Sequence, residues 1–143
     1  MATSDPFNTG YAPLLDNISK RFGFTDFEIF NSGGGCLIAQ TRLEGTAWMW
    51  ITDWDAGIQR LHDRNIKEAN GITLGYNVSI YATDPDNHWC DDCTALASVR
   101  HETAKAADLA GLVQLALSSL PRNAHHTFDK NGEHRIEYGV RHF

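Results

Sequence analysis

The sequence predicts an α+β domain: an antiparallel sheet of four or more strands, packed by one long helix and followed by a C-terminal β-hairpin. Three observations point to this class: alternating apolar residues over 72–81, an apolar stripe at helical spacing over 104–120, and an Asn-Gly pair near the C-terminus. The chain has 143 residues, 42% of them apolar, which suits a single domain over 1–143 with a core of its own.

A short helix is predicted near the N-terminus. Leu14, Ile18 and Phe22 recur at intervals of four and would share one side of a helix. Pro13 suits the first turn of such a helix, and Gly23 suits the position just past its end. We therefore expect an amphipathic helix between this proline and this glycine.

Three strands should follow the helix. Residues 24–30 and 36–43 alternate apolar with polar side chains, and the glycines at 33–35 permit a tight turn between them. Residues 47–51, Ala-Trp-Met-Trp-Ile, are apolar on both faces, which is typical of a central strand. The pattern predicts a hairpin followed by a strand near the middle of the sheet.

The centre of the chain is predicted to continue with a less regular segment and then a fourth strand. Ile58, Leu61 and Ile66 have helical spacing, so residues 53–70 should form either a short helix or a structured loop. Residues 72–81 are clearer, because every second side chain is apolar, as in a strand with one buried face.

One long helix is expected after the acidic segment 83–92. Apolar residues form a single stripe at helical spacing between Leu109 and Leu120, and Pro121 would end the helix. The helix-forming run starts directly after the acidic segment and so includes residues 94–101, and the part of it that we expect to pack across the sheet is the helix over 104–120.

The C-terminal residues predict a β-hairpin around Asn131 and Gly132, a pair that favours a two-residue turn. Such a turn brings together three pairs of complementary charge, which are Lys130 with Glu133, Asp129 with His134, and His126 with Glu137. The hairpin is expected either to join the sheet or to stand apart from it.

Composition excludes two classes of partner. The chain carries 18 acidic against 12 basic residues, a formal charge of −6, and has no basic stripe, so nucleic acid is not an expected ligand. No run of about 18 apolar residues could span a membrane, and the first residues do not resemble a signal peptide. We expect a cytoplasmic protein, in a bacterial host, whose thiols are reduced.

A Cys-x-x-Cys pair is the main candidate for a metal site. Cys90 and Cys93 have the spacing of a zinc clasp, and His88 is near enough to be a third ligand. Cys36 or a histidine of the C-terminal segment would complete the set. The alternative is two reduced thiols that pack as small apolar groups. Trp-Cys-x-x-Cys also resembles the motif of thioredoxin-like oxidoreductases, but the flanking strand and helix pattern of that family is missing.

Tryptophans supply a second candidate site. Because strand side chains alternate, Trp48 and Trp50 should share one face, with Met49 and Ile51 on the other. The pair is expected either to form core beneath a helix or, with Trp54, to form an aromatic patch that anchors a protein partner. No catalytic residues are expected.

Three segments carry a family resemblance: NSGGGCLIA at 31–39, TAWMWITD at 46–53 and LGYNVSIYATD at 74–84. Over residues 24–84 the chain resembles small uncharacterised proteins of actinobacterial phages and plasmids. The resemblance implies a compact antiparallel-sheet domain and carries no catalytic position. The expected function is that of a phage-type accessory protein that binds a host or phage protein without catalysis. The alternative is a zinc-stabilised domain or metalloenzyme, so zinc is a possible cofactor.

Overall fold

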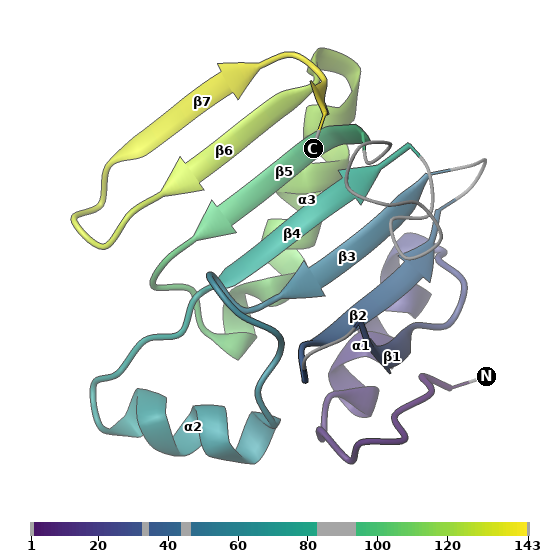
Figure 1. Cartoon of the computed structure of the whole chain (residues 1–143), viewed down its shortest axis with the longest axis vertical. Helices are drawn as coiled ribbons and strands as arrows, with labels where there is room; N and C mark the ends of the chain where they lie inside the picture. Colours follow the sequence, from purple (N-terminus) through teal and green to yellow (C-terminus); the bar gives the residue numbers. More distant parts are fainter. Residues whose placement is uncertain (1, 33–34, 44–46, 83–93, 143) are drawn as a thin grey trace.

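The computed structural model describes residues 2–32, 35–43, 47–82 and 94–142, which form a mostly antiparallel sheet with helices on one face (Figure 1). The strands lie in the order β1 to β7 across the sheet, and the short β8 pairs with β5. Their bounds are β1 Glu28–Asn31, β2 Leu37–Arg42, β3 Trp48–Thr52, β4 Tyr76–Tyr81, β5 Thr94–His101, β6 Ala124–Phe128, β7 His134–Tyr138 and β8 Arg141–His142.

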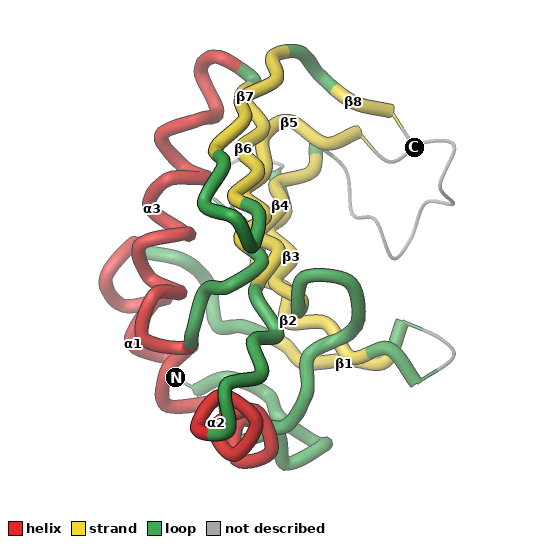
Figure 2. The backbone as a smooth tube through the Cα atoms, turned by 90° about the vertical axis from the view of Figure 1, so that its left-hand side faces the viewer, coloured by secondary structure: helices red, strands yellow, loops and turns green. Residues whose placement is uncertain are grey.

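Three α-helices accompany the sheet, and they are α1 Ala12–Phe22, α2 Leu61–Ala69 and α3 Leu109–Ser119. Figure 2 shows α1 and α3 against the same face of the sheet, with α2 beyond one end of the strands. The core lies between the sheet and these two helices, and Ile18 and Val113 of the helices belong to the same buried cluster as Met49 and Val78 of the sheet. The predicted α+β class is confirmed. No helix in the described ranges is long and apolar enough to cross a membrane.

The predicted N-terminal helix is confirmed. Pro13 lies in the first turn of α1, and Gly23 ends the helix in the left-handed conformation, with φ of 73°. The Gly23 N–H donates to the carbonyl of Ser19, which satisfies an acceptor at the end of the helix. Leu15 and Ile18 turn one face of the helix into the core.

The predicted strands of the first half are present, but two begin later than expected. The Thr41 hydroxyl donates to the carbonyl of Thr25 over 2.7 Å, so the chain before β1 is held by side-chain bonds and not by a strand ladder. Before β4, Gly75 adopts a φ of +63°, where a Cβ would lie 2.5 Å from the carbonyl oxygen of His101. Only glycine fits this position, and regular pairing starts at the next residue.

The expectation of one long helix from the acidic segment to Leu120 is wrong, because residues 94–101 form β5. Ala95, Ala97 and Val99 are buried at alternate positions, which is the pattern of a strand. Alanine favours helices in isolation, but burial between β4 and β6 outweighs that preference. The helix proper is α3, which lies between the 3-10 turns Ala106–Asp108 and Leu120–Arg122 and turns its predicted apolar stripe into the core.

Strand β6 lies parallel to β5, the one parallel pair that joins the named strands of the described sheet. Parallel neighbours need a crossover connection, and α3 supplies it across the sheet. The C-terminal hairpin of β6 and β7 therefore joins the sheet, and β7 lies at its end.

The turn of that hairpin differs from the predicted two-residue turn. The Asp129 carboxylate accepts hydrogen bonds from the backbone N–H groups of Asn131 and Glu133 over 2.9 and 3.0 Å. Gly132 has φ of 81°, but Asn131 does not have the positive φ that the predicted turn requires. A three-residue loop closed by this aspartate results.

The longer loop shifts the pairing by one residue. His126 lies opposite Ile136 and not opposite Glu137, so the three expected charge pairs are wrong. A shift of one residue exchanges the two faces of a strand, so β7 turns Glu137 to the face that carries His125.

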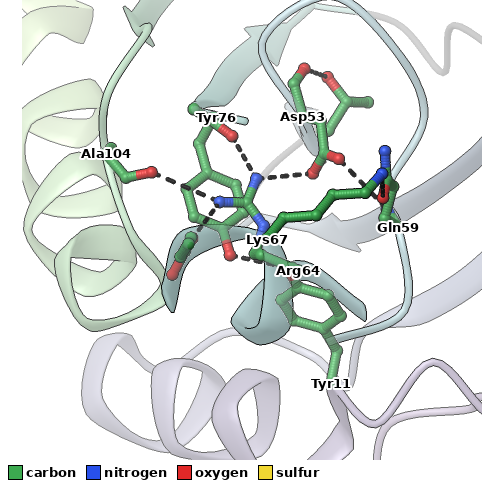
Figure 3. A network of polar contacts seen from close by, with 10 residues as sticks. Tyr11, Asp53, Gln59, Arg64, Lys67, Tyr76 and Ala104 are labelled. Atoms are coloured by element: carbon green, nitrogen blue, oxygen red, sulfur yellow. Dashed lines mark hydrogen bonds and ion pairs between the residues drawn. The ribbon is translucent and has the colours of Figure 1, made fainter. Parts of the chain in front are cut away.

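A buried arginine connects α2 to the sheet (Figure 3). Arg64 has no exposed surface, and its guanidinium donates to Asp53 over 2.8 Å and to Glu68 over 2.9 Å. It also donates to the backbone carbonyls of Gly75 and, over 3.4 Å, of Ala104. These acceptors come from the segments after β3, within α2, before β4 and after β5, so one side chain holds four parts of the chain together.

Two tyrosines complete the surroundings of this arginine. The Arg64 guanidinium lies over the ring of Tyr76, 3.8 Å from its centroid, and the Tyr76 hydroxyl is 2.6 Å from that of Tyr11. Burial raises the pKa of Tyr11 to about 12 and also raises the pKa of Tyr76, so both hydroxyls stay protonated at neutral pH. Apart from the Arg64 Nε, which has no described partner, the polar groups of this network bond to one another, so we interpret it as structural.

Replacing Asp53 with alanine should lower the free energy of unfolding by about 3 kcal/mol, because Arg64 would remain buried with an unpaired charge. Urea denaturation measures this loss. The matched control is Glu137→Ala, which removes the exposed ion pair with Arg141 and should cost less than about 1 kcal/mol. Equal losses in the two variants would contradict a special role for the buried pair.

Candidate functional site

The sheet face turned away from α1 and α3 contains a hollow with polar walls. Ser98 and Arg100 alternate along β5 with the core residue Val99, so they lie on this open face. A cavity of about 280 Å³ lies here, bounded by β4, β5, β6 and β8. Its polar lining residues are Asn77, Ser79, Ser98, Arg100, His125 and Arg141.

A serine and a histidine are paired at the floor of this cavity. The Nε2 atom of His125 lies 2.9 Å from the carbonyl oxygen of Gly139, which can only accept, so Nε2 carries the ring proton. Nδ1 is then an acceptor, and the Ser98 hydroxyl donates to it over 2.7 Å. Burial lowers the pKa of His125, and the charge of Arg141 acts in the same direction. The imidazole is therefore neutral at pH 7.

Two guanidinium groups stand beside this pair. Arg100 is stacked on the ring of Trp54, 4.3 Å from its centroid, and donates to the Trp54 carbonyl over 3.2 Å. Its Nε is buried and has no hydrogen-bond partner among the described residues. Arg141 donates to the carboxylate of Glu137 on β7. Among the described lining residues, the charged side chains are the two arginines, and Arg141 is paired with Glu137 from outside the lining.

No cavity was expected here from the sequence, because the helix-forming run predicted between the acidic segment and Leu120 included Ser98 and Arg100. On a helix these residues would not face His125, which lies on another strand. The signal that could have placed them is the alternation of Ala95, Ala97 and Val99, which is short and rich in alanine.

The tryptophan pair is on the open face. Trp48 and Trp50 are half-buried on one side of β3, while Met49 and Ile51 on the other side are fully buried in the core. The interpretation of the pair as core beneath a helix is therefore wrong. The use of these residues as a binding patch remains a prediction.

Neighbouring side chains fix the positions of the tryptophans. Trp50 donates from Nε1 to Gln40 over 2.6 Å, and its ring meets Phe30 and Tyr81 edge-on with centroids 5.9 and 5.6 Å apart. Trp48 is covered on one side by the Arg42 guanidinium. These contacts give the open face an aromatic region over β1 to β4.

The zinc candidates cannot be placed together. Cys36 is half-buried and is a free thiol. His88, Cys90 and Cys93 lie outside the described residues. Within the described ranges, no three His, Cys, Asp or Glu side chains are grouped as a metal site. Zinc binding remains a prediction.

A second histidine links the hairpin to α3. The Nε2 atom of His126 lies 3.0 Å from the Ser119 hydroxyl, and its Nδ1 lies 2.9 Å from Nε2 of His134. Burial lowers the pKa of His126, and the nearby His134 lowers it further. His125 and His126 thus face opposite sides of the sheet, and both are held neutral.

Strand β7 forms the free edge of the sheet. All five of its residues are exposed, and it follows β6 as the last strand of the order. The ladder ends in hydrogen bonds from Asp129 to Glu133 and from Gly139 to Asn123. In an antiparallel ladder, hydrogen-bonded pairs of residues alternate with pairs that are not hydrogen-bonded. The backbone N–H and C=O groups of His134, Ile136 and Tyr138 therefore point away from β6.

Comparison with protein families, with curated proteins and with solved structures finds no match for this chain. The function of the chain is therefore inferred from the geometry of the β7 edge.

The protein should lose stability as the pH falls below about 6.5. The pKa values of His125 and His126 are lowered in the folded state, so the unfolded chain takes up protons first. The stabilising contribution of the neutral rings is present above the unfolded pKa and is lost as the pH falls toward the folded values. Urea denaturation at pH 7.5 and at pH 5 measures this loss of unfolding free energy. His126→Gln should reduce the difference between the two pH values, whereas His62→Gln, at an exposed position on α2, should leave the difference unchanged. An unchanged slope in His126→Gln would oppose this assignment.

If zinc is bound, protein purified without chelator should contain near-stoichiometric metal, and Cys90→Ser should remove it. Elemental analysis provides the measurement. Absence of metal from the unaltered protein would exclude the zinc hypothesis.

Proposed function

We propose that this chain acts by binding another protein, and that the partner adds a strand to the edge of β7. The observation that carries the proposal is the row of outward-facing backbone groups on a strand whose five residues are all exposed. An edge of this kind is a template for strand addition, in which main-chain hydrogen bonds supply much of the affinity.

The opposite edge of the sheet supports this choice by contrast. The N-terminal segment crosses β1, where the Ser4 N–H donates to Phe27 over 3.0 Å and Ile29 donates to Ser4 over 2.9 Å. That edge is therefore partly covered by the chain itself. No described segment pairs with the outer side of β7.

The side chains of β7 also favour a protein contact. Ile136 and Tyr138 lie on the side that faces α3 and are 42% and 62% exposed, and Val140 just beyond is 42% exposed. Arg135 and Glu137 lie on the open face. An incoming strand would thus meet apolar groups on one side and two opposite charges on the other.

Charge complementarity selects one occupant, a second copy of this chain. Two β7 strands related by a twofold axis at Ile136 place Arg135 of each copy opposite Glu137 of the other. His134 then lies opposite Tyr138, and the residues with outward backbone groups form the hydrogen-bonded pairs. Each Arg–Glu pair should contribute about 0.2–1 kcal/mol, and both pairs favour the same register.

A host or phage protein is the partner expected from the sequence resemblance. Such a protein would need an extended segment with an acidic residue opposite Arg135 and a basic residue opposite Glu137. It would compete with the second copy for the same edge.

Charge reversal tests the proposed pairing. Arg135→Glu and Glu137→Arg should each weaken self-association about tenfold or more, because each variant places like charges opposite one another twice. An equimolar mixture of the two variants should recover association, since a mixed pair restores both Arg–Glu contacts. Sedimentation velocity over a range of concentrations measures both effects.

Ile136→Pro provides a control for the backbone contribution. It removes one outward N–H without breaking a hydrogen bond to β6, so the fold should persist while association is lost. A protein that stays monomeric, and whose capture of lysate partners is unaffected by Ile136→Pro, would overturn the proposal. If the protein does not self-associate but captures a lysate protein, and Ile136→Pro abolishes that capture, then the β7 edge binds a different protein and not a second copy of the chain.

A further inference from the structure

The cavity on the open face is separate from the β7 backbone edge and has its own chemistry. At about 280 Å³ it is close to the lower end of small-molecule sites, which begin near 300 Å³. It is formed by regular strands and not by loops alone, so its walls are held by the sheet.

Positive charge and hydrogen-bond donors dominate the described walls. Arg100 and Arg141 contribute two guanidinium groups to a chain whose formal charge is −6. Guanidinium forks match the oxygen atoms of phosphate and carboxylate groups. Such a local concentration of positive charge, in an acidic protein, favours an anionic ligand.

Arg100 in particular has unused capacity. Stacking on Trp54 and the bond to the Trp54 carbonyl fix its orientation, yet its buried Nε has no described partner. Buried donors are nearly always paired in folded proteins. The Nε of Arg64 also has no described partner, but of the two arginines Arg100 is the one that lines the cavity, where a ligand can reach its guanidinium. A bound oxyanion beside this guanidinium would provide the missing partner.

The Ser98–His125 pair can adjust to such an anion. In the neutral state His125 accepts the Ser98 proton, and Ser98 has no proton to offer a ligand. A negative charge nearby favours the protonated ring, in which Nδ1–H donates to Ser98 Oγ and Nε2–H still donates to Gly139. The Ser98 hydroxyl is then free to donate to the anion.

We propose that this cavity binds the phosphate group of a small organic phosphate. Two guanidinium groups and a serine hydroxyl suit a dianion with several acceptor oxygens better than a carboxylate with two. Binding takes up a proton at His125, so it strengthens as the pH falls. The other charged groups near that ring are Arg141 on β8, which opposes protonation, and Glu137 on β7, which favours it.

Titration of the full chain with inorganic phosphate, sulfate and acetate, followed by amide NMR shifts and calorimetry, tests the proposal. Phosphate and sulfate should bind saturably and shift the amides of Ser98, Arg100 and His125. Arg141→Gln should weaken binding about tenfold, as expected for loss of a charge-assisted bond. Arg122→Gln, which removes an exposed charge after α3, should leave binding unchanged.

The pH arm uses sulfate, which keeps its charge across the range. Sulfate should bind more tightly at pH 5.5 than at pH 7.5, and Ser98→Ala should weaken its binding most at the lower pH. If Arg141→Gln does not fold, the effect of Ser98→Ala on sulfate binding at the two pH values decides the test. Lack of saturation, equal weakening by Arg122→Gln, or acetate binding as tightly as phosphate would each overturn the assignment.

Discussion

A buried guanidinium must find acceptors, and this requirement fixes the end of the sheet where α2 lies. Arg64 is fully inside the protein, where an unpaired charge would be very costly, so the chain has to bring its acceptors to it. Asp53, Glu68, Gly75 and Ala104 come from four separate segments, and each reaches the same side chain. The positions of α2, of the start of β4 and of the turn after β5 therefore depend on one another through this side chain.

The two faces of the sheet have different roles: one forms the core, and the other carries the candidate binding surfaces. One face is apolar and receives α1 and α3, which gives the domain its core. The other face carries the aromatic region around Trp50 and the cavity between Ser98 and Arg141. Because side chains alternate along every strand, the residues that build the core also determine which residues reach the open face.

Local sequence patterns predicted much of the fold but not the cavity on the open face. Pro13 and Gly23 bound the first helix as predicted, and the alternation of β4 and the face shared by Trp48 and Trp50 were predicted correctly. These features depend on neighbouring residues only. The wrong predictions concern features that local patterns do not determine. Ala95 and Ala97 favour a helix unless their burial between two strands is known. The hairpin turn depends on hydrogen bonds to the side chain of Asp129. Ser98 and His125 meet through parallel pairing of strands joined by α3, which no local pattern encodes.

The contact between Arg141 and Glu137 joins the cavity to the β7 edge. Glu137 faces outward on the last strand, while Arg141 reaches into the cavity. If both proposals hold, a neighbouring chain that attracts this carboxylate will loosen its hold on Arg141, and the guanidinium will be freer to meet an anion. By thermodynamic reciprocity, the anion will then favour the neighbour to the same degree. A single glutamate would make a small metabolite an effector of assembly.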